Sequence, residues 1–118
     1  MQTRELTRNL AWSNAEKKIA RVAFDAALER ERSAVRREVE AILERSPDSA
    51  EIWSIRDYLN EKAREIGAKY DYRYSVLIDV FARLLAEHWL SVSELNGLAA
   101  EKIQLIEQES THWRERDA

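Results

Sequence analysis

The sequence predicts an all-α fold, and its composition and residue spacing both favour helices. Among 118 residues there are only 2 Gly and 1 Pro, whereas charged residues make up 35%. A compact all-β domain would need more turn-forming residues, and long exposed helices tolerate this many charges. We therefore expect a single helical domain over residues 1–118, with flexible ends at residues 1–11, where periodicity is weak, and 110–118, which are polar.

A long N-terminal helix is predicted to begin after Ser13. Ser13 and Glu16 have the spacing of a capping box, in which the Ser hydroxyl accepts from a free helix amide and the Glu carboxylate accepts from the Ser amide. Nothing interrupts the pattern until Pro47, which cannot continue a helix interior. The helix then spans residues 14–45, or about 48 Å at ~1.5 Å per residue.

The apolar pattern of this helix changes along its length. Its first half is broadly apolar, whereas the second half has a narrow apolar stripe near coiled-coil spacing, formed by Leu28, Val35, Val39 and Ile42. Since the rest of the chain is too short to cover so long a helix, we infer that a second copy packs along it in a homodimer. In the alternative, the helix bends or breaks near Ser33 and packs within one chain.

A second helix is predicted between Pro47 and Gly67. One of its faces carries apolar residues three, four and seven positions apart, namely Ile52, Ile55, Leu59 and Ile66. The residues that lie off that face are Trp53, Arg56, Asp57, Asn60 and Arg64. Gly67 weakens the helix and is expected to end it or kink it.

The run KYDYRYS at residues 69–75 is the densest aromatic and charged segment of the chain. Tyr rings combine an apolar body with a polar tip, which suits a half-buried junction. The run is therefore either a packing joint between helices or a recognition surface in which Tyr70 and Arg73 contact a partner, and the two interpretations are compatible. Asp71 or Ser75 is expected to cap the helix that follows.

The most apolar segment, residues 76–90, is predicted to be the central core helix. Asp79 interrupts it and is expected to point outward, because a buried carboxylate would need a partner. A second capping box at residues 91–94 begins a short helical turn that meets Gly97. A last helix is predicted over residues 98–109.

The residue content argues against several classes of function. Because there is no Cys, disulfides, thiolate metal sites and cysteine nucleophiles are impossible. His88 and His112 lie far apart, and no phosphate-binding, dinucleotide-binding, nucleophile or metal motif occurs, so we expect no enzyme, cofactor or metal site. The segment that faintly resembles a DNA-recognition helix, residues 98–110, has 1 Lys and 3 Glu, which argues against nucleic acid. Without a signal peptide or a membrane span of ~20 apolar residues, a cytoplasmic protein is expected.

Residues spread over most of the chain resemble the fluorescence recovery protein family. The resemblance runs from Trp12 to Ile106 and is strongest in KYDYRYSV at residues 69–76 and in VFARLL at residues 80–85. Further matching positions are Ser13, Ala15, Glu16, Ile52, Trp53, Asp57, Tyr58, Leu59, Lys62, Glu65, Ile66, Glu94, Leu95, Gly97, Leu98, Glu101 and Lys102. A pattern of this extent is more specific than any short motif.

The resemblance implies an all-helical protein, usually a dimer resembling a helical bundle, with a long extended helical part and a small helical head. Cyanobacterial members of the family bind the light-activated orange carotenoid protein, speed its return to the resting form and so end photoprotective quenching of the phycobilisome. They act as protein partners and carry no cofactor. The alternative is a dimeric helical adaptor or signalling module of the same fold that binds an unrelated protein.

The resemblance also implies where dimer and partner contacts lie. The Trp and Asp of the family's dimer and binding region match Trp53 and Asp57, and the family's Arg falls at Ala63, next to Arg64. We expect Trp53 to be an anchor, and Asp57 and Arg64 to be charge partners at i and i+7 that can meet across the dimer. Two further contact positions of the family, a Phe and a Lys, fall at Asp79 and Leu105.

Overall fold

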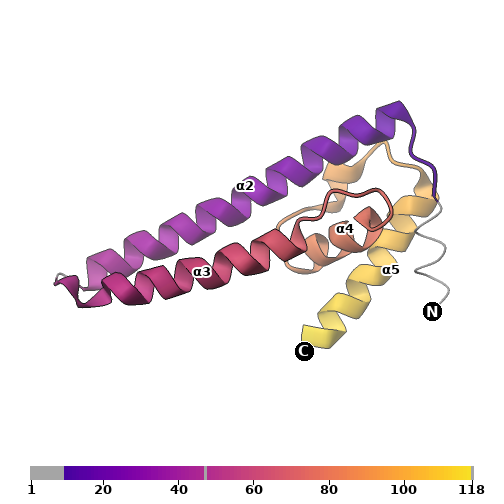
Figure 1. Cartoon of the computed structure of the whole chain (residues 1–118). Helices are drawn as coiled ribbons and strands as arrows, with labels where there is room; N and C mark the ends of the chain where they lie inside the picture. The colour runs from indigo at the N-terminus through magenta and orange to yellow at the C-terminus, as the bar shows by residue number, and fades with distance from the viewer. Residues whose placement is uncertain (1–9, 47, 118) are drawn as a thin grey trace.

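The computed structural model is built of helices joined by short turns and coils, and it describes residues 10–46 and 48–117 (Figure 1). The helices are α2 (Asn14–Arg45), α3 (Ile52–Lys69), α4 (Leu77–Ala86) and α5 (Ala100–Asp117). Two 3-10 turns, η1 (Ser49–Glu51) and η2 (Val92–Leu95), lie between α2 and α3 and between α4 and α5. The prediction of an all-α fold with a long N-terminal helix is confirmed.

Helix α2 begins and ends where the sequence predicts. The Ser13 amide donates to the Glu16 carboxylate at 3.0 Å, and the Glu16 amide donates to the Ser13 hydroxyl at 3.1 Å, which completes the capping box. The helix continues without interruption for 32 residues, so the alternative of a break near Ser33 is wrong. Pro47, which was expected to end this helix, lies outside the described residues, as do residues 1–9 of the expected N-terminal flexible end.

Helices α2 and α3 form a hairpin, and we call its outer part, residues 32–66, the arm. In Figure 1, α3 runs back beside the second half of α2, with η1 at the tip. The arm makes the molecule elongated, with extents of 53 × 28 × 21 Å. The apolar stripe of α2 predicts that a second copy packs along this length, but α3 of the same chain lies against one side of it.

The other elements pack on the first half of α2 and form with it the head, which comprises residues 10–31 and 70–117. The most buried side chains of α4, led by Leu77, Ile78, Phe81 and Leu84, form the centre of its core. Apolar residues of α2, η2 and α5 complete this core, namely Ala20, Ala23, Phe24, Ala27, Leu95, Leu98 and Ile106. Gly97 lies here with a φ of 106°, a backbone conformation that favours glycine, and its nearest neighbour is the end of the Ile19 side chain. No helix within the described residues is long and apolar enough to cross a membrane.

The predicted capping of α4 is wrong, and so is the expectation that Gly67 ends α3. Val76 is the N-cap residue of α4 and makes no side-chain capping bond, so neither Asp71 nor Ser75 caps this helix. The Asp71 carboxylate accepts instead from the guanidinium of Arg73. Gly67 does not end α3, because the helix continues to Lys69.

The C-terminal end also differs from the prediction. The last helix is predicted to end at Glu109 and to be followed by a fraying tail, but α5 continues to Asp117. Ser110 is buried, and the Trp113 indole nitrogen donates to the Asp79 carboxylate at 3.2 Å. Asp79 itself is exposed, as predicted, and it provides the contact that holds this part of α5 against α4.

Candidate protein-interaction surface

The outer face of α3 brings together three of the predicted contact residues. Trp53, Asp57 and Arg64 follow one another at i, i+4 and i+11, which places them on one side of a helix with 3.6 residues per turn. All three are exposed, and Trp53 keeps 65% of its surface in contact with solvent. A large exposed aromatic beside charges of both signs has the composition of a protein contact.

Within one chain the acidic residue of this face is paired with a neighbouring Arg, and its expected pairing with Arg64 across a dimer stays a prediction. The Arg56 guanidinium donates to the Asp57 carboxylate at 3.0 and 3.1 Å, and it also lies 5.2 Å from the centre of the Trp53 ring. Within one chain, Asp57 is therefore paired with Arg56 and not with Arg64. The cation–π contact holds the Trp53 ring in place on the helix surface.

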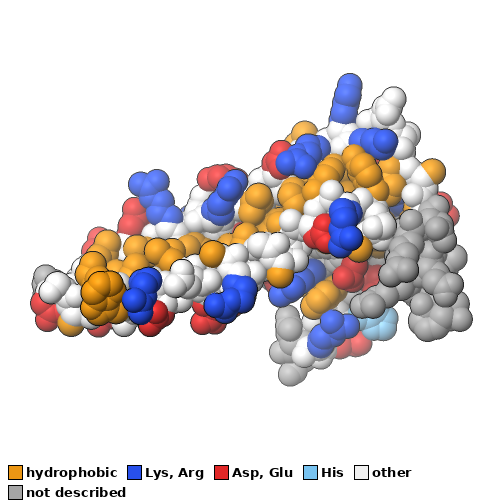
Figure 2. All heavy atoms as spheres, viewed as in Figure 1, with side chains coloured by type: hydrophobic (Ala, Val, Ile, Leu, Met, Phe, Trp, Pro, Cys, Tyr) orange, Lys and Arg blue, Asp and Glu red, His pale blue; other side chains and the backbone are white. Residues whose placement is uncertain are grey.

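Apolar side chains of the arm remain open to solvent on its other faces. Leu43 of α2 and Ile52 and Leu59 of α3 are all exposed, although the sequence places Ile52 and Leu59 on the inward face of their helix. Figure 2 shows hydrophobic side chains running along the arm between charged ones. Monomeric proteins seldom leave a continuous apolar strip of this kind uncovered, so it marks an interaction surface.

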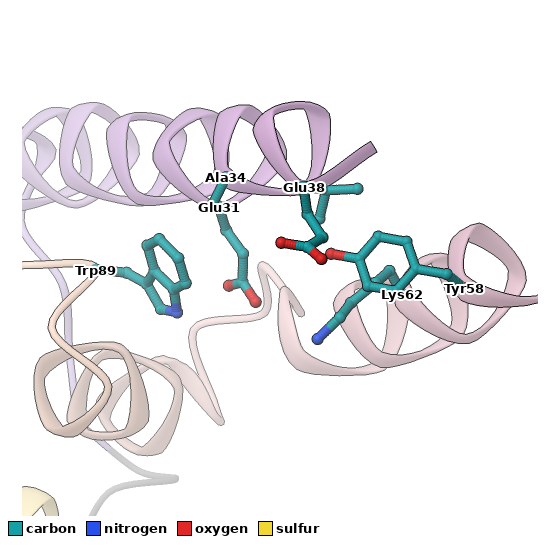
Figure 3. Close-up of a pocket in the computed structure, with 7 residues that line it drawn as sticks. Glu31, Ala34, Glu38, Tyr58, Lys62 and Trp89 are labelled. Atoms are coloured by element: carbon teal, nitrogen blue, oxygen red, sulfur yellow. The ribbon is translucent and has the colours of Figure 1, made fainter. Parts of the chain in front are cut away.

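A groove of about 270 Å³ lies between α2 and α3 at the base of the arm. Its lining residues are Glu31, Ala34, Val35, Glu38, Tyr58, Lys62 and Trp89 (Figure 3). In the close-up, Glu38 and Tyr58 point toward one another from α2 and α3, and Trp89 of the head closes one end.

Tyr70 and Arg73 lie away from this surface, where α3 meets the head. The Tyr70 hydroxyl donates to the Glu31 carboxylate at 2.8 Å, and its ring packs edge-on against Phe24 with 5.5 Å between ring centres. Burial, together with the neighbouring Glu31 carboxylate, raises the pKa of Tyr70. Tyr70 is thus part of a packing joint, whereas Arg73 is exposed and donates to Asp71 at 2.9 Å.

A buried cluster of charges next to Tyr70 was not predicted from the sequence. Lys69 lies between the carboxylates of Glu31 and Glu87, with 2.7 Å to each. A periodicity signal for it exists: Glu31 follows Phe24 and Ala27 at i+7 and i+4 on the buried face of α2. A charged residue at a core position of the helical repeat indicates a buried partner elsewhere in the chain.

Within the described residues, no group of three or more His, Cys, Asp or Glu side chains is arranged to hold a metal ion. The arm has the features of a surface for binding protein: exposed aromatic and aliphatic side chains, charges of both signs and a shallow groove.

Comparison with known proteins gives a consistent result. Residues 12–109 match a family model described as "Photoprotection regulator fluorescence recovery protein". The chain is 38% identical over 96 residues to the fluorescence recovery protein of Synechocystis sp. PCC 6803, a match that covers 81% of this chain and 88% of that protein. The structure of the fluorescence recovery protein from Fremyella diplosiphon is similar, with a TM-score of 0.79, 39% identity and coverage of 86% of this chain and 99% of that one. The Synechocystis structure matches with the same TM-score and 37% identity.

Proposed function

This chain belongs to the fluorescence recovery protein family of photoprotection regulators, and on that premise we propose that it binds the light-activated orange carotenoid protein. By binding, it speeds the return of that protein to its resting form and ends quenching of the phycobilisome. The proposal places it in the cytoplasm and requires no cofactor and no catalytic step of its own. It is supported by the family match and by the exposed surface of the arm.

The observation that carries the proposal is the uncovered apolar strip of the arm. Ile52 and Leu59 lie on the apolar face of α3, yet both remain exposed in a single chain, as does Leu43. A two-helix arm with so little buried apolar surface gains little from hydrophobic burial. A second copy of the chain lying along the arm covers the strip, and we propose that the working form is this homodimer.

The mechanism we propose is differential affinity. A regulator accelerates its partner's return to the resting form only if it binds the conformations on the way to the compact state more tightly than it binds the activated state. Trp53 is the anchor in this scheme, since a large preorganised aromatic contributes strongly to a protein contact. Asp57 and Arg64 are exposed on the same face and provide charges that can pair with those of another chain.

The test is the dark recovery rate of photoactivated orange carotenoid protein, measured with and without an equimolar amount of this protein. We expect a clear acceleration. For the Trp53→Ala variant we expect that at least tenfold more protein is needed for the same acceleration, because loss of an anchor costs ~2 kcal/mol or more of binding free energy. Val22→Ala is the matched control, because Val22 is 71% exposed but lies outside the arm. Equal recovery rates with the two variants would show that Trp53 does not take part in the contact.

A second candidate is an adaptor of the same fold that binds an unrelated protein. It is favoured by Asp79, because the resemblance places a partner-contacting Phe at this position, and the exposed carboxylate is instead bonded to Trp113. If the folded, dimeric protein does not accelerate the recovery of the orange carotenoid protein, this candidate is favoured. Affinity capture with the unmodified protein and with the Asp79→Phe variant would then identify the partner.

A further inference from the structure

The buried cluster of charges where α3 ends has no role in the function proposed above. Lys69, at the end of α3, donates from its ammonium to Glu31 of α2 and to Glu87 at the end of α4, each at 2.7 Å. Only 5% of the Lys69 side chain is exposed. The cluster therefore joins three helices through one buried cation.

The cluster is balanced in charge and complete in hydrogen bonds. The Tyr70 hydroxyl donates to the second oxygen of Glu31 at 2.8 Å, and Arg83 donates to the second oxygen of Glu87 at 2.9 Å. Each carboxylate oxygen thus has a donor, and the two cations offset the two carboxylates. Moving any member by more than a fraction of an ångström leaves a buried charge without a partner, which is costly.

This cluster matters because α3 has no other buried attachment. Lys69 is the only buried residue of α3, and the apolar residues of its inner face remain partly or fully exposed. Residues three and four positions apart on a helix occupy similar places, so a slide of α3 by one turn, about 5.4 Å, exchanges one loose apolar contact for another. The apolar contacts alone do not select one register between α3 and α2.

We propose that the buried charge cluster fixes the register of α3 along α2, and that Lys69 is the positioning residue. The members of the cluster are Glu31, Lys69, Tyr70, Arg83 and Glu87. The register in turn decides where the outer face of α3, with Trp53, stands relative to the head. This functional consequence rests on the proposed function, whereas the positioning itself concerns this chain alone. A contribution to stability alone would not explain the cluster, since apolar residues in the same volume often stabilise a protein as well or better.

The test measures the register directly. Because the chain contains no Cys, Arg37→Cys on α2 and Asn60→Cys on α3 introduce two unique sites for spin labels, and both positions are exposed. Doubly labelled protein is diluted with unlabelled protein, so that pulsed electron paramagnetic resonance reports only distances within one chain. The unmodified cluster is expected to give a single narrow distance distribution.

A quadruple variant replaces the buried polar groups by apolar ones of similar size, with the substitutions Glu31→Leu, Lys69→Met, Tyr70→Phe and Glu87→Leu. We expect it to remain helical by circular dichroism and to melt no earlier, but to show a distance distribution broadened or shifted by about one helical turn. An unchanged narrow distribution overturns the proposal. If this variant does not fold, a second variant with Glu31→Gln, Lys69→Met and Glu87→Gln keeps the side-chain volumes similar and carries the same two outcomes.

Lys62→Met is the matched control. Lys62 lies on the same face of α3, seven residues before Lys69, but its contact with Glu65 at 3.4 Å is within its own helix. It is expected to leave the distance distribution narrow, and an effect as large as that of the cluster variants would also overturn the proposal. Because no partner is present in the measurement, its result is independent of whether the orange carotenoid protein is the partner.

Discussion

His88 adopts a left-handed backbone conformation, with a φ of 67°, at the end of α4. This conformation lets the Trp89 amide donate to the Leu84 carbonyl at 2.9 Å and closes the helix, but a residue with a Cβ adopts it at a cost. Since the His88 side chain is exposed, His88→Gly is expected to stabilise the protein by about 0.5–1 kcal/mol, measured by urea unfolding. The same change at His112, inside α5, is expected to destabilise it by ~1 kcal/mol. Effects of the same sign at both positions would contradict this explanation.

Glu16 makes the stability of the head sensitive to acid. Burial raises the pKa of Glu16, but hydrogen bonds from the Ser13 and Ala99 amides and the Lys102 ammonium outweigh it and lower the pKa to about 2. The unfolded chain has the ordinary value of 4.5, so the contribution to stability is complete above that pH and is lost as the pH falls toward 2.

Glu16→Gln is therefore expected to lower stability near neutral pH and to reduce the loss of stability between pH 4.5 and 2, measured by urea unfolding across that range. A remaining loss is expected, because the hydrogen bonds from Arg30 lower the pKa of Glu94 to about 2 as well. Glu107→Gln, at an exposed position of α5, is the control. A pH profile of Glu16→Gln that parallels the unmodified protein would refute the assignment.

Single residues also show what sequence can and cannot predict. The capping box of Ser13 and Glu16 was predictable because both partners lie within one turn, but the same Glu16 carboxylate also accepts from Lys102 at 3.1 Å across the head. That second contact, like the pairing of Lys69 with Glu31, joins residues distant in sequence. Helical periodicity identifies which face a charge occupies but not which partner the fold brings to it.

At the scale of elements, the last helix is the clearest difference between prediction and structure. Residues 110–117 lie beyond the family match and have a polar composition, which predicts a frayed end. They remain helical because Trp113 docks on α4: its indole bonds Asp79, and its ring lies 4.9 Å from the Arg83 guanidinium. One docked aromatic, which local composition does not reveal, thus extends the helix by two turns.

Trp113→Ala is expected to destabilise the protein by about 1–2 kcal/mol, because it removes a hydrogen bond, a cation–π contact and buried apolar area. Urea unfolding measures this loss, and circular dichroism is expected to show fewer helical residues. Arg114→Ala is the neighbouring control, since Arg114 is exposed and its change is expected to stay within ~0.5 kcal/mol. Equal effects of the two variants would mean that the docking of Trp113 contributes nothing specific.

For the whole molecule, the sequence predicts the long helix and the central core segment, but not how the arm is made. The stripe of Val35, Val39 and Ile42 on α2 predicts only that something packs there, and α3 and a second copy fit that pattern equally well. The structure places α3 on one side of the stripe, and exposed Leu43, Ile52 and Leu59 remain. Of the predicted site, Trp53, Asp57 and Arg64 share one face, whereas Tyr70 belongs to the joint with the head.

The exposed strip of the arm yields the last prediction, which concerns assembly. If a second copy covers the arm, Leu59→Glu puts a carboxylate into that interface without a partner. A cost of about 3 kcal/mol over the two copies raises the Kd of the dimer roughly a hundredfold, which light scattering across a dilution series detects as a shift toward monomer mass. Val22→Glu introduces the same charge at a more exposed position outside the arm and is expected to leave the mass unchanged. Dissociation by Val22→Glu and not by Leu59→Glu would place the interface on the first half of α2, and the exposed strip of the arm would then be left for the partner protein.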